Sequence, residues 1–442
     1  MNNKISKTAA LVVLLLATFC NGVFAQQTKK LTLKEAVDLS ITNSKNLRIS
    51  TARIDEAKAM VQQANDARLP DFNVSGSYLR LSSAHVDLKT GGGNGGSGGG
   101  SSPSPNQAMY GMATLSLPIY AGGRIKYGIE SAKYLQQAAE LDATDDKEAV
   151  VFNTTKAYVN LYKAAQAVAI VKENLNTSKS RDSNFTNLEK NGIMARNDLL
   201  KSQLQTSNIE LALLDAENSY KLATVNMNLI LGLPENDGIE IDSSFINSVT
   251  DEKTFLEYQS LALQNRKDIQ ALGFRKKAAI TGLKSAKAET YPTIGLTGGY
   301  IAADIPHLLT VYNAVNVGVG VKYNIASLWK KNTKLMQAKA KEAQVNASEE
   351  LLNDEVRFGV NQDYQNYLLS KKKIDVYQKA IEQATENFRI TNNKYNNSLA
   401  TITDLLEANT ALLQSKLNIE TAKADVVLAY QKLLQTTGTT NY

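Results

Sequence analysis

The sequence predicts a mainly α-helical protein that also carries four membrane-type β-strands and is built from two similar halves. Three observations predict this fold class. Residues recur at fixed distances along the chain, proline is absent from long stretches rich in helix-forming residues, and four segments, each long enough for one strand, alternate polar with apolar side chains. Each half is expected to supply one helix, two strands and a pair of long helices.

The two halves repeat at two different distances. Asn43 and Gly76 recur in the second half as Asn265 and Gly298, and one offset relates both pairs. Further along the chain a second, shorter offset relates the pairs Tyr158 and Tyr364, Asp198 and Asp404, and Gly232 and Gly438. The difference between the two offsets equals the length of the glycine-rich segment 90–105. An internal duplication with one inserted surface loop explains this pattern.

The chain begins with a predicted secretory signal peptide at residues 1–25. A basic start and an apolar run at 9–19 precede an acceptable cleavage site at Ala25. The apolar run is too short to span a membrane as a helix. Cys20 is the only cysteine, and lipidation there is disfavoured because the bulky Phe19 precedes it. Cleavage after Ala25 leaves no thiol for disulfides or catalysis.

The first structural repeat is predicted to span residues 26–234. After an initial helix, its elements are strand 71–81, the glycine-rich outer loop 82–110, strand 111–120 and long helices over 122–231. No proline lies between residues 119 and 233. Because proline inside a helix costs about 3 kcal/mol, this gap permits very long helices. Apolar residues from Val150 to Leu175 step by threes and fours, which predicts a coiled-coil seam.

An inter-repeat linker is predicted at 235–250, and the second structural repeat at 251–442. After its own initial helix, the elements of this repeat are strand 293–302, outer loop 303–314, strand 315–325 and long helices over 327–435. No proline follows Pro306. Apolar residues between Leu406 and Leu434 repeat the coiled-coil spacing of the first half.

The four predicted strands have the features of strands that cross a lipid bilayer. In strand 315–325, apolar residues from Val315 to Ile325 share one face, while Asn316 and Lys322 lie on the other. Polar faces of Asn, Ser, Thr and Gly suit a water-filled lumen, and aromatic residues gather at the strand ends. An ordinary half-buried sheet uses the same alternation and is the alternative.

Four strands are too few to close a barrel within one chain. An open sheet edge cannot exist in lipid, because its backbone N–H and C=O groups find no partners there. The barrel must therefore be shared among copies, and three copies supply 12 strands. The loops 82–110 and 303–314 would face out of the cell, because helices extend from the other strand ends. These considerations predict a homotrimer.

Composition argues against several other classes of protein. Removing Lys4 and Lys7 with the signal peptide lowers the formal charge from +6 to +4, and no basic stripe is present, so nucleic acid is not an expected partner. The only histidines, His85 and His307, lie beside the predicted outer loops, which argues against a metal site or histidine catalysis. The glycine-rich run 91–100 lacks the Gly-Lys-Ser/Thr of a phosphate loop. Neither a cofactor nor an enzymatic activity is expected.

Three sets of motifs carry a resemblance to a known family. They are the helix ends 67–70 and 288–292 that each feed a strand, the helical turns 192–200 and 395–408, and the closing segment 229–234. In their duplicated order they make the chain resemble the TolC-like outer-membrane efflux protein family, the outer membrane factors of tripartite efflux and type I secretion systems. The resemblance covers essentially the whole mature chain.

The resemblance implies a homotrimeric channel-tunnel. A 12-stranded barrel in the outer membrane of a Gram-negative cell would continue into a long α-helical coiled-coil barrel in the periplasm. Proteins of this family are passive exit ducts for substrates that an inner-membrane pump delivers. The implied partners are two further copies of the chain, a periplasmic adaptor (membrane fusion) protein, the pump and outer-membrane lipid.

The resemblance also implies where the periplasmic end of the channel closes. By match to the family's turn motif, Asp404 and Glu407 would form acidic rings in the constriction, which would favour cations over anions. Crowding in such rings would raise the pKa of the carboxyl groups. Tyr395 and Asp198 occupy the positions of contacts that hold the mouth shut. The helix tips are the expected docking points for the adaptor, near Gly192 and Ser398.

Some alternatives are left open by the sequence. Asp198 and Asp404 could simply cap helices after a turn, since Asp is a preferred N-cap residue. The family often has a basic residue or glycine where this chain has Ala400 and Ser398, so a basic latch would have to come from elsewhere. As a whole, the chain could instead be a secreted periplasmic coiled-coil adaptor or structural protein that inserts into no membrane.

Overall fold

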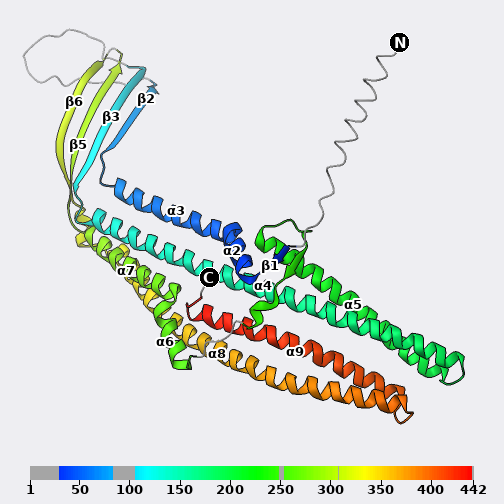
Figure 1. Cartoon of the computed structure of the whole chain (residues 1–442). Coiled ribbons are helices and arrows are strands. Elements are labelled where there is room, and N and C mark those ends of the chain that lie inside the picture. Colours follow the sequence, from blue (N-terminus) through cyan, green and yellow to red (C-terminus); the bar gives the residue numbers. More distant parts are fainter. Residues whose placement is uncertain (1–28, 83–104, 248–252, 307, 441–442) are drawn as a thin grey trace, which may run out of the picture. The chain divides into compact units, whose positions relative to one another are not determined.

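The structure is a computed structural model that describes residues 29–82, 105–247, 253–306 and 308–440 (Figure 1). The predicted signal peptide and most of the glycine-rich loop lie outside the described residues. The chain forms two compact units, and each draws segments from both sequence halves. Unit 1 comprises Met1–Ile49, Thr144–Lys267 and Asn353–Tyr442, and unit 2 comprises Ser50–Ala143 and Asp268–Leu352. The units therefore do not coincide with the two sequence repeats.

Unit 2 contains a four-stranded antiparallel sheet (Figure 1). Its strands, in spatial order, are β2 (Asp71–Arg80), β3 (Gln107–Tyr120), β5 (Thr293–Ile305) and β6 (Leu309–Lys322). The strands β2 and β3 form one hairpin, and β5 and β6 form the other. The pairing of β3 with β5, in which Ala113 lies opposite Tyr300, joins the two sequence halves into one sheet.

Two predicted boundaries in the second hairpin are wrong. The predicted outer loop 303–314 is mostly strand, because pairing continues to Ile305 opposite Leu309. The alternation loses its phase there because the register shifts between Ile301 and Ala303. Asn313 adopts a φ of 60°, and its backbone N–H donates to the hydroxyl of Tyr300. A bulge of this kind moves the following side chains to the opposite face.

The other boundary errors also have local causes. Strand β3 begins at Gln107 rather than 111, because its pairing with β2 extends to Arg80 opposite Gln107. Strand β6 ends at Lys322 rather than 325, and the 3₁₀ helix η2 (Ile325–Leu328) follows it. The long helix predicted from 327 begins at Thr333, where the side-chain oxygen of Asn332 accepts the N–H of Leu335 and caps the first turn.

Ion pairs connect three of the helices of unit 2. The helices of this unit are α3 (Lys45–Asp66), α7 (Lys267–Ala288) and the first parts of α4 (Arg124–Lys190) and α8 (Thr333–Asn396). Arg275 on α7 pairs with Asp142 on α4, and Lys276 pairs with Glu349 on α8. None of the helices in the described ranges combines the length and apolarity needed to cross a membrane.

Unit 1 is built from helical hairpins, and its largest apolar cluster surrounds Tyr158. Its helices are α2 (Leu33–Asn43), α5 (Arg196–Leu231), α6 (Phe255–Asn265), α9 (Ile402–Thr436) and the later parts of α4 and α8. Tyr158 lies fully buried in this core, where its hydroxyl donates to the carbonyl of Leu31 at 2.7 Å and accepts the N–H of Asp242 at 3.1 Å. Burial raises the pKa of this phenol.

The predicted inter-repeat linker 235–250 contains structure that the sequence did not predict. It holds the short strand β4 (Ile239–Ile241), which pairs in parallel with β1 (Lys29–Leu31), and the 3₁₀ helix η1 (Ser243–Asn247). Phe245 from η1 packs edge-on against Tyr158 with ring centroids 5.3 Å apart. The described part of the linker therefore belongs to the core of unit 1.

The duplication is visible in matching local structures. Thr32 and Glu35 form a capping box at the start of α2, and Thr254 and Glu257 form the same box at the equivalent point of the second half, at α6. Similarly, α5 is followed by Gly232 with a φ of 70° and α9 by Gly438 with a φ of 64°. A side chain at Gly232 would meet Asn43, and one at Gly438 would meet the backbone of Asn265 and Arg266.

Two glycine substitutions separate backbone strain from this close packing. Gly192 and Gly232 both have a φ of 70°, but a Cβ at Gly232 would lie 2.9 Å from the Cβ of Asn43, whereas a Cβ at Gly192 would meet nothing within 4 Å. We expect Gly192→Ala to lower the free energy of unfolding by about 1 kcal/mol and Gly232→Ala by about 3 kcal/mol. Thermal unfolding followed by helical circular dichroism measures both. Equal losses would contradict a packing role for Gly232.

Candidate functional site

Two helical hairpins of unit 1 end in turns of the same geometry. In the turn between α4 and α5, Gly192 donates to the carbonyl of Glu189 and Ile193 to that of Leu188, both at 2.9 Å. In the turn between α8 and α9, Ser398 donates to Tyr395 and Leu399 to Lys394, at 2.9 and 2.8 Å. Both sets of bonds form a Schellman motif, which needs a left-handed residue after the helix.

The left-handed residues are the two predicted docking positions. Gly192 has a φ of 70° and Ser398 a φ of 61°, and both side-chain positions are exposed. Glycine adopts this conformation without cost, whereas serine is strained there. The offset that relates Asp198 to Asp404 therefore also relates two turns that match in backbone but differ in side chain.

An apolar cluster, called here the tip cluster, joins the two hairpins near these turns. Its buried members are Phe185, Leu199, Ile402 and Leu405, and Leu188, Met194, Phe388, Tyr395 and Leu406 pack around them. The cluster draws residues from all four helices. The ring of Tyr395 on α8 lies against Phe185 on α4, with centroids 5.7 Å apart. This contact positions Tyr395 between the two hairpins.

The predicted acidic residues Asp404 and Glu407 lie exposed on the first turns of α9, beside the buried Leu405. Asp404 is not the N-cap residue, because Thr401 holds that position. The carboxylate of Asp404 accepts the backbone N–H and the hydroxyl of Thr401, both at 2.8 Å. The hydroxyl of Thr401 in turn accepts the N–H of Asp404 at 3.2 Å. The two residues thus form a third capping box.

This capping box sets the charge state of Asp404 within one chain. The hydrogen bond from the backbone of Thr401, followed by that from its hydroxyl, lowers the pKa of Asp404. Asp404 therefore keeps its negative charge to a lower pH than an unconstrained aspartate. In a single chain this direction is opposite to the rise expected from crowded carboxylates.

Asp198 occupies the matching place on α5 but has different contacts. It lies in the first turn after the N-cap Ala195, which makes no side-chain cap. Asp198 pairs with Lys201 at 3.6 Å. In the described part of the chain no hydrogen bond joins Asp198 to Tyr395. Their charges still interact: burial, followed by the negative charge of Asp198, raises the pKa of Tyr395.

One basic residue near the tip cluster, Arg181, was not predicted from the sequence. Arg181 on α4 is half-buried, and its Nη2 donates to the hydroxyl of Ser178 at 2.8 Å. Its buried Nε has no hydrogen-bond partner among the described residues. Burial lowers the pKa of Arg181, while the charges of Asp182 and Tyr395 raise it. Arg181 is thus a basic group whose charge interacts with Tyr395.

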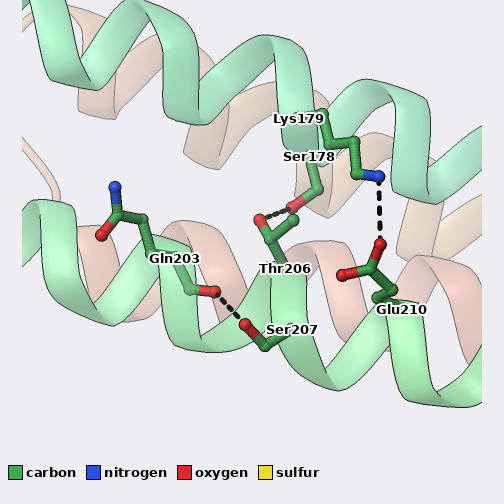
Figure 2. Close-up of polar contacts among 6 residues, drawn as sticks. All are labelled: Ser178, Lys179, Gln203, Thr206, Ser207 and Glu210. Atoms are coloured by element: carbon green, nitrogen blue, oxygen red, sulfur yellow. Dashed lines mark hydrogen bonds and ion pairs between the residues drawn. The ribbon is translucent and has the colours of Figure 1, made fainter.

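A polar seam between α4 and α5 extends from Arg181 away from the tips. Figure 2 shows Ser178 and Thr206 with their hydroxyls hydrogen-bonded at 2.6 Å in the buried interface, and Lys179 paired with Glu210 at 3.2 Å on its exposed side. On α5, the hydroxyl of Ser207 donates to the carbonyl of Gln203 at 3.1 Å. Polar contacts thus lie beside the apolar contacts of Val171 and Leu175 with Ile209 that also join the two helices.

Two exposed apolar residues at the tips were also missed. Ile193 and Leu399 follow the two left-handed residues and are 73% and 76% exposed. They hold equivalent positions in the two sequence halves, so the offset that relates the turns would have found them. Each turn thus presents one large apolar side chain to solvent at the same position.

Across the described ranges there is no group of three or more His, Cys, Asp or Glu residues that could hold a metal ion. His85 and His307 lie outside the described residues. In the described residues the site is composed of helix caps, an apolar cluster with one aromatic contact, and a few charges.

Comparison with known proteins places this combination of sheet and helical hairpins in a known class. The structure matches that of the outer membrane protein VceC from Vibrio cholerae with a TM-score of 0.75, covering 92% of this chain and 96% of that one at 18% sequence identity. This likeness defines the fold as that of outer-membrane channel proteins. The model of the outer membrane efflux protein family matches residues 36–233 and 259–439. The chain belongs to this family, which locates it in the outer membrane.

Curated relatives agree with this family at low identity. The cation efflux system protein CusC of Escherichia coli K12 is 26% identical over 289 residues, which cover 64% of this chain and 58% of that protein. The outer membrane efflux protein BepC of Brucella suis is 22% identical over 332 residues, covering 73% and 71%. The chain thus spans somewhat more than half the length of CusC.

The capping box at α9 gives a testable prediction. We expect Thr401→Ala to lower the free energy of unfolding by about 1 kcal/mol, because it removes the N-cap hydroxyl. It should raise the pKa of Asp404 only part of the way to its ordinary value, since the backbone N–H of residue 401 still donates. Carbon NMR of labelled aspartate across a pH series measures this pKa.

The sign of the pH dependence provides the control. The folded-state pKa of Asp404 is lowered, so its contribution to stability is present above the ordinary value and is lost as the pH falls through the folded-state value. The stability difference between the unaltered protein and Asp404→Asn should therefore shrink in acid. A difference that stays constant would contradict the capping role of the carboxylate.

Proposed function

We propose that three copies of this chain form the outer-membrane exit duct of a tripartite efflux or type I secretion system. The duct passively conducts substrates that an inner-membrane pump and a periplasmic adaptor deliver. The observation that carries this proposal is the four-stranded sheet, which has an exposed apolar face and an unpaired strand edge on each side within the described part of the chain.

The apolar face of β6 supports insertion into lipid. Val315, Val317, Val319 and Val321 are between 67% and 76% exposed. A continuous row of exposed valines is unfavourable in water and favourable in a bilayer. The alternative of a soluble periplasmic adaptor or structural protein would leave this row in contact with water, so we favour the duct.

Aromatic residues at both ends of the sheet support the same conclusion. On β3, Tyr110 lies three residues after the start of the strand and Tyr120 ends it, and both are exposed. A strand that rises about 3.3 Å per residue covers roughly 33 Å between them, or roughly 25 Å across a bilayer when tilted by about 40°. This is about the height of the apolar band of an outer-membrane barrel.

The unpaired edges of the sheet support an assembly of three copies. Within the described part of the chain, β2 and β6 each pair on one side only. Joining β6 of one copy to β2 of the next satisfies both edges, and three copies close a barrel of 12 strands.

The tip cluster is the proposed gate of this duct. Three copies would bring Asp404 and Glu407 into acidic rings, and the contact of Tyr395 with the α4–α5 hairpin, near Asp198, would hold the mouth shut. The adaptor would dock at the turns around Gly192 and Ser398, with the exposed apolar residues of both turns as its contacts. Exposed carboxylates in a narrow mouth favour the passage of cations.

The gate predicts a specific change in conductance. In planar bilayers we expect the purified protein to show low, cation-selective conductance. The double variant Asp404→Ala/Glu407→Ala should raise the conductance and lose cation selectivity, because it removes the acidic rings. A heat-labile trimer on gels is expected for both proteins.

A matched control separates charge from helix capping. Thr401→Ala weakens the same capping box without changing the charge of the mouth, so it should retain cation selectivity. Unchanged conductance and selectivity in the double variant would reject the gate but not the duct. A purified monomer that never enters bilayers would reject the duct itself.

A further inference from the structure

The end of the sheet next to the helices carries many exposed cations. We define the helix-side rim as residues 66–71, 120–126, 287–293 and 322–334, which connect the strands of unit 2 to its helices. The rim contains eight cationic residues, all exposed, and three anionic residues. The cationic residues are Arg68, Arg124, Lys126, Lys287, Lys322, Lys330, Lys331 and Lys334, and the anionic residues are Asp66, Asp71 and Glu289.

The opposite end of the sheet has no such excess in its described part. Residues 78–82, 105–107, 303–306 and 308–309 contain one cation, Arg80, and one anion, Asp304. The positive charge is therefore concentrated at one end of the strands.

Three consecutive residues of the rim have the composition of a membrane–water interface. Trp329 is 70% exposed, and Lys330 and Lys331 follow it. Neither lysine forms an ion pair with the described residues, whereas Lys334 is paired with Glu289 at 2.8 Å. Tryptophan prefers the headgroup level of a bilayer, and lysine extends its charge toward the headgroups.

The apolar row of β6 leads directly to this triplet. Val321 is followed by the exposed Tyr323 and Ile325, and then by Trp329. A surface that changes from apolar to aromatic to cationic along the chain matches the change from acyl chains to headgroups across one leaflet.

We infer that the helix-side rim binds anionic phospholipid headgroups, with Trp329 at headgroup level and Lys330 and Lys331 against the phosphates. The inference rests on the proposed function, because it requires the sheet to lie in a bilayer. Charge complementarity selects the lipid: the rim is strongly positive, and an anionic headgroup carries the net negative charge that a zwitterionic headgroup lacks.

The chain's single tryptophan makes the inference directly testable. The full chain is reconstituted into vesicles that contain either brominated phosphatidylglycerol or brominated phosphatidylcholine, since bromine on the acyl chains quenches indole fluorescence. We expect the anionic lipid to quench Trp329 more strongly at equal mole fraction. The preference should reach about fivefold for each lysine in contact with a headgroup, and salt should reduce it.

Paired variants assign the preference to the two lysines. Lys330→Gln/Lys331→Gln should lower the lipid preference by roughly tenfold or more. Lys372→Gln/Lys373→Gln makes the same change of charge at exposed positions of α8 in unit 1 and should leave the preference unchanged.

Each contrary result has a distinct meaning. Equal quenching by the two lipids in the unaltered protein would overturn the lipid preference and leave the proposed duct intact, because Trp329 would still lie at the bilayer. An unchanged preference in Lys330→Gln/Lys331→Gln would overturn the assignment to these lysines. Absence of quenching by either lipid would place Trp329 away from the bilayer and overturn the proposed membrane position of the sheet.

Discussion

The unpaired backbone groups along the outer edges of β2 and β6 constrain everything else in this molecule. In the described part of the chain each of these strands has a partner on one side only. Within lipid there is no water to hydrogen-bond the free N–H and C=O groups, and each one left alone costs several kcal/mol. Contact with lipid would be favourable for the exposed valines of β6. The unpaired edge of β6, however, would be unfavourable in lipid if the sheet remained open. In the proposed duct, neighbouring copies of the chain would pair with these edges, so that one assembly would satisfy both the unpaired backbone groups and the apolar face.

The strands could be predicted because alternation reports directly on which face meets lipid and which meets water. Their limits could not, because the bulge after Ile301 and the left-handed Asn313 change the phase of the alternation without leaving a mark in composition. The short strands β1 and β4 escaped detection for another reason. Three residues carry no period, and Leu31 and Ile241 become neighbours only after the intervening chain has folded.

For the helix tips, the repeat distance located both turns, since a left-handed residue must follow each helix at the same point. From the sequence Asp404 was expected to be a gate residue or an N-cap, whereas Thr401 is the N-cap and Asp404 closes the capping box three residues later. The partial burial of Arg181 was not predicted, because an arginine within a long helix is usually exposed to solvent. Its burial arises only once the helices pack together, and its Nη2 then donates to Ser178 on the same helix.

The serine at position 398 has a consequence for symmetry. The two hairpins of each chain follow nearly the same path at their turns, but one turns on a relaxed glycine and the other on a strained serine. A ring of three chains would then present six turns that are quasi-equivalent in backbone and alternate in side chain. A partner with true sixfold symmetry would meet two kinds of contact around that ring, and its successive subunits would be held with unequal affinity.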